Sequence, residues 1–382
     1  TRKQLYNIHL ATLDLLEHTG VKVRYEEALK LLDVAGANVD YKKQIVKIPR
    51  HLVREALKKA PSSITLAGRN SKNDLKLEDG KTYFGTLGTA PYVQDLETGK
   101  RRPATKKDVE DFARVADALE NIHYFHTMAN PSDVPLEICD LHRWEATLRN
   151  TAKHAMGGAV YKTENMPYLI RMCCAVIDDE EKLRKRPIIS IIECPVSPLI
   201  YDTRGTHNII EFSKRGLPIM IYSEPQAGAS APVTLAGTLV IVNAEVLSGI
   251  TIVQLVNPGT PVIYASVATI MDMKAANIAF GSPETGLLSV ATTQLARYYN
   301  VPNLCAGGRA DSKIPDAQAG YEKARNALIS ALAGSNLNNM AGALESNLKV
   351  SFEQLIIDNE IVGTIKRVIE GIEVTDETLA LE

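Results

Sequence analysis

PNLCAGGRADSKIPDAQAGYE, residues 302–322, passes from a short apolar segment through two glycines into a charged loop and then into an amphipathic segment. This order predicts a strand at 303–306, a loop carrying Arg309, Asp311 and Lys313, and a helix that begins after Pro315. In a βα unit of this kind, working residues stand at the carboxyl end of the strand. The number of such units in the chain therefore decides the fold.

The same alternation repeats over residues 81–382. Strands are predicted at 82–85, 123–129, 155–160, 188–193, 218–223, 261–267, 303–306 and 338–344. Helices are predicted at 106–119, 136–150, 165–179, 203–214, 235–253, 283–299, 317–332 and 351–370. Eight strands that are each followed by a helix favour an α/β fold of the (β/α)8 barrel type over an open doubly wound sheet. A hairpin of 92–95 with 100–103 is expected as an insertion after the first strand.

Residues 1–80 have a different pattern, with helices predicted at 5–18, 25–35 and 49–59 and short strands at 45–48, 63–66 and 75–77. We interpret this part as a small α+β cap that precedes a barrel of residues 81–382.

Bulk composition excludes several classes of protein. A net charge of -2 with 23% charged residues gives no indication of nucleic acid or of an anionic membrane as partner. The five cysteines include no C-x-x-C pair, and the N-terminus has no secretory leader, so a cytoplasmic protein is expected. The apolar run at 233–256 is interrupted by Asn243, Glu245 and Gln254, which indicates a buried helix and not a membrane span.

No metal site is predicted. His123 and His126 are the one close histidine pair, but residues three apart on a strand point to opposite faces, so a structural role is favoured for both.

Three carboxylates end predicted strands: Glu193, Glu224 and Glu345. Each could serve as a general acid or base or as a ligand for a cation. Alternatively, each could cap a neighbouring helix or pair with Arg309 and Lys313. Glu193 and Glu224 are our predicted catalytic residues.

Two basic residues follow the seventh strand. Arg309 comes after Gly307 and Gly308, and a guanidinium there suits a substrate carboxylate or a phosphate, although it could also tie loops together. Lys313 could form a Schiff base, but Asp311 beside it would keep the amine protonated. We therefore predict a structural ion pair of Asp311 with Lys313.

Several further side chains near strand ends could surround a quaternary ammonium group through cation–π attraction and polar contacts, although each alone could equally be core or rim. The predicted substrate-binding set is Arg309, Glu345, Phe352, Tyr92, Tyr222, Tyr264 and Gln226.

Five long segments resemble the trimethylamine methyltransferase superfamily of corrinoid-dependent methyltransferases. They are GRNSKNDLKL (68–77), DLETGKRRPAT (95–105), APVTLAGTLVIVNAEVLSGI (231–250), QLVNPGTPVIYASVATIMDM (254–273) and DSKIPDAQAGYEKA (311–324). The resemblance runs over essentially the whole chain. It implies a (β/α)8 barrel that moves a methyl group from a methylated amine to the Co(I) corrinoid, a cobalamin, of a separate carrier protein.

The resemblance also implies that this chain holds no cofactor itself. Asp140-Leu141-His142 begins like the D-x-H-x-x-G signature of corrinoid-carrying domains, but Glu145 stands at the glycine position. The partner expected is the cognate corrinoid protein, docked over the barrel mouth, and symmetric self-association is also expected.

The founding members of the superfamily carry pyrrolysine and use trimethylamine. No such residue is written here, so the chain is similar to the branch that demethylates quaternary amines such as glycine betaine, proline betaine or carnitine. Arg309 would then bind the substrate carboxylate, and Glu345 with Phe352 the cationic head. Family members usually continue beyond the point where this sequence ends, so a C-terminal extension is expected to be missing.

Three alternatives stay open at this stage. The protein could be a trimethylamine methyltransferase whose pyrrolysine is written as an ordinary residue. It could be a barrel lyase or aldolase that uses Lys313. It could also bind a betaine without catalysis.

Overall fold

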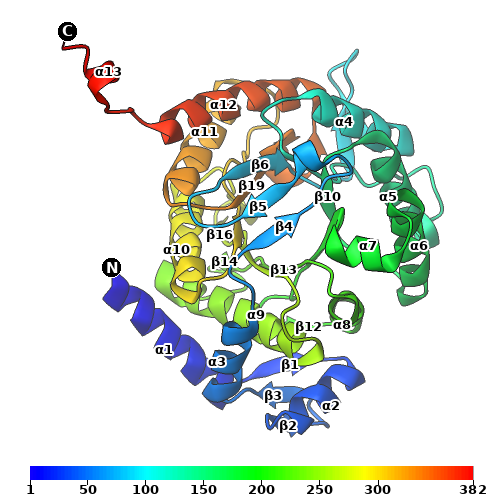
Figure 1. Ribbon diagram of the computed structural model, residues 1–382, viewed down its shortest axis with the longest axis vertical. Coiled ribbons are helices and arrows are strands. Elements are labelled where there is room, and N and C mark those ends of the chain that lie inside the picture. The colour runs from blue at the N-terminus through cyan, green and yellow to red at the C-terminus, as the bar shows by residue number, and fades with distance from the viewer. Residues whose placement is uncertain (382) are drawn as a thin grey trace.

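A closed barrel of eight parallel strands forms the centre of the computed structural model, which describes residues 1–381 (Figure 1). Around the barrel the strands are β6 (Tyr83–Thr86), β9 (Tyr124–His126), β10 (His154–Gly157), β11 (Ile189–Glu193), β13 (Ile219–Ser223), β15 (Val262–Ser266), β18 (Asn303–Cys305) and β19 (Leu337–Ala341). Parallel pairing of β19 with β6 closes the ring. All eight predicted strands and the predicted barrel are confirmed.

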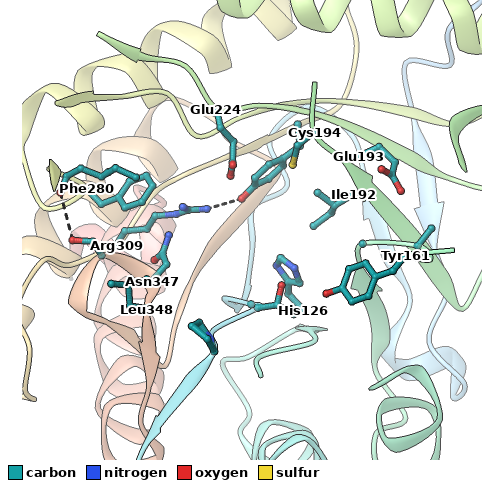
Figure 2. Close-up of a pocket in the computed structure, with 18 of the residues that line it drawn as sticks. His126, Tyr161, Ile192, Glu193, Cys194, Glu224, Phe280, Arg309, Asn347 and Leu348 are labelled. Carbon is teal, nitrogen blue, oxygen red and sulfur yellow. Dashed lines mark hydrogen bonds between the residues drawn. The ribbon is translucent and has the colours of Figure 1, made fainter. Parts of the chain in front are cut away.

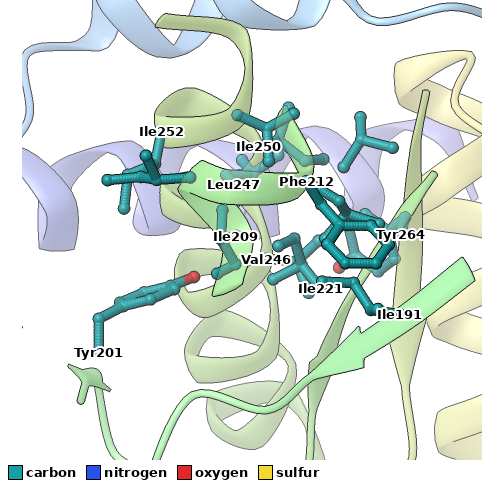
Figure 3. Packing of buried hydrophobic residues seen from close by; sticks show 14 of the residues in the cluster. Ile191, Tyr201, Ile209, Phe212, Ile221, Val246, Leu247, Ile250, Ile252 and Tyr264 are labelled. Atoms are coloured by element: carbon teal, nitrogen blue, oxygen red, sulfur yellow. The ribbon is translucent and has the colours of Figure 1, made fainter. Parts of the chain in front are cut away.

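The barrel strands are apolar because both of their faces are covered. Every residue of β11, β13 and β15 is buried, as is typical of parallel strands with helices outside and packed side chains inside. Figure 3 shows the outer layer, where Ile191, Ile221 and Tyr264 pack near Phe212 and Val246 of the helices.

Eight long helices follow the strands: α4 (Lys106–Ala118), α5 (Cys139–Asn150), α6 (Met166–Ile177), α8 (Thr203–Arg215), α9 (Leu235–Val256), α10 (Pro283–Tyr299), α11 (Ala317–Leu332) and α12 (Phe352–Glu370). Most begin at a Ser, Thr or Asp whose side chain accepts from a backbone N–H of the first turn. The predicted helix at 165–179 ends earlier, at Ile177, because Asp178 has a positive φ and Asp179 caps a separate short helix, α7 (Glu180–Lys185).

The N-terminal part contains α1 (Arg2–His18), β1 (Val21–Val23), α2 (Glu26–Val34), β2 (Asn38–Asp40), β3 (Ile45–Lys47) and α3 (Arg50–Lys59). β1 also pairs with β12 (Ile200–Tyr201), which lies in the loop after barrel strand β11. The sheet thus draws on both sides of the predicted boundary at residue 80, and the division into a cap and a barrel stays a prediction.

A hairpin of β4 (Ile64–Leu66) and β5 (Leu75–Leu77) closes the amino-terminal end of the barrel. Its apolar side chains pack with inward-facing barrel residues such as Met156 and Leu337. Backbone bonds join it to the start of β11, where the Ala67 N–H donates to Pro187 O at 3.0 Å. Any pocket must therefore open at the opposite, carboxyl-terminal end.

Helix α9 lies between the barrel and the N-terminal helices. It packs on α1, α2 and α3 on one side and on β13 and β15 on the other (Figure 1). By length and composition it could cross a membrane, but 83% of its most apolar window is buried within the protein. The prediction of a buried helix is confirmed, and the surrounding layers explain why this helix is apolar on every face.

The remaining strands lie on the carboxyl-terminal face of the barrel. The predicted hairpin is present as β7 (Tyr92–Gln94) and β8 (Arg101–Pro103), and β21 (Lys349–Val350) joins it to β20 (Ala343–Leu344). The other small elements are β14 (Gln226–Ala227), β16 (Thr269–Asp272), β17 (Asn277–Ile278), the 3-10 turns Ser71–Asn73, Leu136–Ile138, Thr163–Asn165 and Glu345–Asn347, and α13 (Asp376–Leu379).

Candidate functional site

A cavity of about 420 Å³ opens at the carboxyl-terminal ends of the barrel strands. Its walls come from the ends of all eight strands, or the segments that follow them, and from the start of α8 (Figure 2). Four of the predicted site residues line it: Glu193, Glu224, Tyr222 and Arg309. The structure thus brings together the ends of β11, β13 and β18 as the barrel topology requires.

Arg309 is a buried cation on the cavity wall. Its side chain is 2% exposed, its Nη2 donates to the Tyr222 hydroxyl at 2.6 Å, and its guanidinium lies 4.6 Å from the ring centre of Phe280. Within residues 1–381 no carboxylate forms an ion pair with it, and its Nε has no hydrogen-bond partner. Glu224 is near enough to interact electrostatically with Arg309 but forms no ion pair with it, and a desolvated guanidinium without a paired counter-charge is costly unless a ligand supplies one.

Of the two carboxyl groups in the cavity, Glu193 and Glu224, Glu193 is the one held by a side-chain hydrogen bond. Asn208 Nδ2 of α8 donates to its Oε1 at 2.8 Å, and only 6% of the residue is exposed. Burial raises the pKa of Glu193 to about 8, although the bond from Asn208 works in the opposite direction. The group is therefore mostly protonated at neutral pH.

Glu224 and Cys194 lie deep in the barrel but present much of their surface to the cavity. Burial raises the pKa of Glu224, while the neighbouring Arg309 lowers it. Burial also raises the pKa of the Cys194 thiol, so this sulfur is not a thiolate at neutral pH.

His126 lines the cavity, although the sequence analysis favoured a structural role for it. The sequence feature that could have identified His126 as a cavity residue is its position as the last residue of a barrel strand. Burial lowers the pKa of His126 to about 3, and the nearby Arg143 and Arg309 add to this effect. The ring is consequently neutral at neutral pH.

Tyr161 forms the wall opposite Arg309 (Figure 2). Its hydroxyl accepts from Arg143 Nη1 at 3.0 Å and donates to Asn130 Oδ1 at 3.1 Å, while its backbone N–H donates to Asp140 at 2.7 Å. Asp140, from the incomplete corrinoid-like signature, thus holds this loop. Sequence patterns missed Tyr161 because it lies several residues beyond the strand.

Five predicted substrate-binding residues lie outside the cavity lining. Glu345 accepts from Arg101 Nη1 at 2.9 Å, and the same guanidinium lies 4.4 Å from the Tyr92 ring centre. Phe352 stacks on Phe112 with ring centres 3.8 Å apart, inside the helical layer.

The last two of the five are also placed elsewhere. Tyr264 faces the outer layer, where its hydroxyl bonds Asn243 Oδ1 at 3.1 Å, because alternate residues of a barrel strand point outward. Gln226 begins β14, and its backbone N–H donates to Ser230 at 3.0 Å.

Asp311 organises the loops around Arg309, but not through Lys313. Its carboxylate accepts from the backbone N–H groups of Phe280 and Gly281 at 2.9 and 2.8 Å and from Ser346 Oγ at 2.7 Å. The predicted ion pair with Lys313 is wrong, since that side chain is exposed and no such pair occurs in the described chain. Asp311 therefore joins three cavity-lining segments.

The turn Glu345–Asn347 has a left-handed backbone, with φ values of 52°, 51° and 71°. Such values are unfavourable for residues other than glycine and are kept only where the surroundings enforce them. Here the N–H groups of Glu345 and Ser346 donate to Ser312 O at 2.7 Å and Ala310 O at 3.1 Å. The turn places Asn347 in the cavity wall, and its buried Oδ1 has no partner among residues 1–381.

The cavity chemistry limits the reactions it can perform. Residues 1–381 contain no cluster of three or more His, Cys, Asp or Glu arranged to hold a metal ion. No lysine lines the cavity in the same range, so Schiff-base chemistry has no amine there. What remains is the Arg309 and Arg204 guanidinium groups, two carboxyl groups, the Cys194 thiol, a neutral imidazole and aromatic walls.

A closed (β/α)8 barrel with this charged cavity at its carboxyl-terminal end belongs to the class of barrel enzymes that act on small polar molecules. Residues 1–382 match the family model described as trimethylamine methyltransferase (MTTB). The chain therefore belongs to this methyltransferase family, and the resemblance seen in the sequence is confirmed.

Named relatives fall into two groups. The chain is 41% identical over 380 residues to a trimethylamine methyltransferase MttB of Desulfitobacterium hafniense, covering 100% of this chain and 76% of the relative. It is 40% identical over 392 residues to the MttB of Methanosarcina thermophila, covering 100% and 80%. It is 35% identical over 384 residues to a glycine betaine methyltransferase of Desulfitobacterium hafniense, covering 100% and 79%.

Among solved structures, the monomethylamine methyltransferase MtmB of Methanosarcina barkeri superposes with a TM-score of 0.62. The alignment covers 97% of this chain and 81% of that protein at 12% identity. At this identity the likeness supports the fold alone.

Proposed function

We propose that this protein transfers a methyl group from a quaternary amine that also carries a carboxylate, glycine betaine or a related betaine, to the Co(I) corrinoid of a partner protein. The observation that carries the proposal is the buried Arg309, which faces the cavity without an ion-pair partner in the described chain. A betaine carboxylate would supply the missing counter-charge through a bidentate bond.

The other wall suits the cationic end. Tyr161 offers an aromatic ring, with the Arg143 and Arg204 guanidinium groups 5.3 and 5.9 Å from its centre, and Glu193 lies beside it (Figure 2). An aromatic ring and a carboxylate stabilise a quaternary ammonium by cation–π and ionic attraction. A zwitterion would therefore place its carboxylate at Arg309 and its ammonium group at this wall, where Glu193 ionises when the cation binds.

Trimethylamine is the competing methyl donor. The relatives named for it are 41% and 40% identical, against 35% for the glycine betaine methyltransferase. Trimethylamine has no anionic group, however, and would leave the buried Arg309 without an ion-pair partner. We therefore favour the betaine.

A partner corrinoid, when docked, supplies the strong nucleophile that accepts the methyl group. The rim of the cavity fits such a partner because exposed apolar side chains gather on loops that follow the barrel strands: Val196, Val233, Met273 and Leu348. Exposed apolar residues at a mouth are typical of an interaction surface.

The residues of this chain would bind, orient and desolvate the donor. When the C–N bond breaks, its electron pair stays on nitrogen and a neutral tertiary amine leaves, so no proton is needed at the leaving group. Glu193 and Glu224 would accordingly act as electrostatic ligands of the cation and not as general acids. Holding one methyl toward the mouth and excluding water would account for most of the rate.

The test follows the absorbance change of cob(I)alamin with glycine betaine, trimethylamine or tetramethylammonium as donor. We expect methylation from glycine betaine, and we expect Arg309→Met to reduce kcat/KM for it by about 100-fold or more, given the strength of bidentate charge-assisted bonds. Lys313→Met, on the same loop but exposed, is the matched control and should match the wild type.

Methylation from trimethylamine but not from any betaine would overturn the proposal in favour of the competing donor. An intact mass equal to that of the printed sequence would exclude a hidden pyrrolysine. The mass and the donor preference together separate the two candidates.

A further inference from the structure

The floor of the cavity contains a hydrogen-bonded chain that starts at Tyr124, inside the barrel. The Tyr124 hydroxyl donates to Asn339 Oδ1 at 2.7 Å, and both side chains are buried. Because the carbonyl oxygen of Asn339 receives this proton, its amide nitrogen must face the other way. In this arrangement the Asn339 amide nitrogen faces His126 and Tyr222.

The Asn339 amide in turn fixes the tautomer of His126. Asn339 Nδ2 lies 3.3 Å from His126 Nδ1, and an amide nitrogen can only donate. His126 Nδ1 is thus an acceptor, so the single proton of the neutral ring is on Nε2. No protein group in residues 1–381 accepts from Nε2, and the ring borders the cavity.

The direction of the Tyr222 O–H is likewise set by the donors that its oxygen accepts from. Its oxygen accepts from Arg309 Nη2 at 2.6 Å and from Asn339 Nδ2 at 3.4 Å. With both lone pairs used, its own O–H must point elsewhere, and the cavity is the open direction. Burial raises the pKa of Tyr222, so this proton stays in place.

Three groups that line the cavity thus each keep one N–H or O–H without a protein acceptor among the described residues: the Arg309 Nε–H, the His126 Nε2–H and the Tyr222 O–H. We propose that His126 Nε2–H, Tyr222 O–H and the Arg309 guanidinium form a single carboxylate-binding subsite, and that Asn339 is the positioning residue that aims the first two. The inference rests on the proposed function, and it fixes the direction of the substrate. The carboxylate lies between these donors, and the ammonium group points toward Tyr161 and Glu193.

The charged groups around His126 favour this assignment. Arg143 and Arg309 both face the ring and oppose its protonation. A neutral Nε2–H donor can bind a carboxylate over a wide range of pH, whereas a histidine that must be protonated would release it near neutrality.

The first test measures the tautomer directly. With 15N-labelled histidine in the whole protein, the ring whose signals are lost in His126→Gln should show an Nε2–H pattern that does not titrate between pH 5 and 9. Asn339→Asp should reverse this pattern to Nδ1–H, since an aspartate carboxylate at that position accepts a hydrogen bond from Nδ1–H. A charged ring or an Nδ1–H tautomer in the wild type would overturn the inference.

The second test separates the two ends of the ligand by calorimetry. His126→Phe should weaken the binding of glycine betaine by about tenfold or more, which is the loss expected for a hydrogen bond to a charged group. The affinity for tetramethylammonium should stay unchanged. His126→Gln, which keeps an N–H donor, should recover part of the loss. His123→Gln is the matched control, because His123 lies at the other end of the same strand and outside the cavity lining.

Equal losses for both ligands in His126→Phe would mean a general packing role and would overturn the inference. If the wild type binds tetramethylammonium but no betaine, the proposed donor fails, and acetate then decides the subsite alone. Acetate binding that is lost in His126→Phe would support the subsite. Absence of acetate binding in the wild type would overturn it as well.

Discussion

At the scale of single residues, the cavity holds ionisable groups away from their usual protonation states. Glu193 is the clearest example, because burial against apolar barrel residues raises its pKa to about 8. A carboxyl group of this kind is neutral in the free protein and becomes charged when a cation binds beside it.

Cation affinity should therefore depend on pH. Binding of tetramethylammonium favours the ionised Glu193 and releases a proton, so affinity should rise as the pH increases from 7 to 9, by about tenfold for a pKa near 8. Calorimetry in buffers of different ionisation enthalpy would measure both the affinity and the proton released. Glu193→Gln should show a flat profile, and a flat profile in the wild type would refute a role for this group.

Asp311 supports a second prediction at this scale. Its three bonds join the Phe280 segment and the 345–347 turn to the Arg309 loop. Asp311→Ala leaves two buried backbone N–H groups without partners, which costs about 1–3 kcal/mol each. We expect a clear fall in the free energy of unfolding and a higher KM for betaine, both absent in Lys313→Ala.

At the scale of elements, one buried ion pair connects α11 and α12 to the cavity. Lys323 Nζ donates to Asp358 Oδ2 at 3.0 Å and to Met340 O at 2.7 Å, and Asp358 accepts from the Gly342 N–H at 2.7 Å. Both side chains are fully buried. The pair holds the end of β19 in place and so supports the turn that follows it.

Breaking this pair should be strongly destabilising. Lys323→Met leaves Asp358 buried without a counter-charge, and such changes cost about 3–5 kcal/mol. The double variant Lys323→Met/Asp358→Leu should recover a substantial part of that loss. Urea unfolding would measure both, and a double variant no more stable than the single one would argue that the pair also specifies the β19 geometry.

The elements also show which patterns a sequence reveals. The barrel strands were predictable because each is a buried run between loop residues and is followed by a helix, in most cases with a side-chain cap. β1 and β2 were not, since each has three residues and β1 depends on pairing with the distant β12. Of the site, Glu193, Glu224, Tyr222 and Arg309 were predictable because they stand at strand ends.

The prediction that Glu345 lines the cavity is wrong, for a reason that cannot be read from the sequence. The predicted strand at 338–344 was expected to carry it to the mouth. Instead, β19 is irregular between Asn339 and Ala341, and the chain then leaves the barrel as β20. Glu345 consequently meets Arg101 outside the cavity. Phe280 and Tyr161 were missed because long loops bring them back to the cavity wall.

At the scale of the whole molecule, α9 depends on its cover. The helix is apolar on all faces, and α1, α2 and α3 shield the side that the barrel does not. Deletion of residues 1–60 should therefore give protein that binds a hydrophobic dye and aggregates. Deletion of residues 372–382 should not, since 372–381 are exposed. A deletion variant that stays soluble and monomeric would contradict this prediction, because it would show that α9 does not need α1, α2 and α3 to shield its apolar surface.

The position of α9 in the chain also has a consequence for biosynthesis. By length and composition this helix resembles the segments that the membrane-insertion machinery recognises. Its covering helices are encoded first, and at about 5–20 residues per second they have several seconds to form before α9 emerges. The order of the gene thus lets the nascent chain shelter its most membrane-like segment as soon as that segment appears.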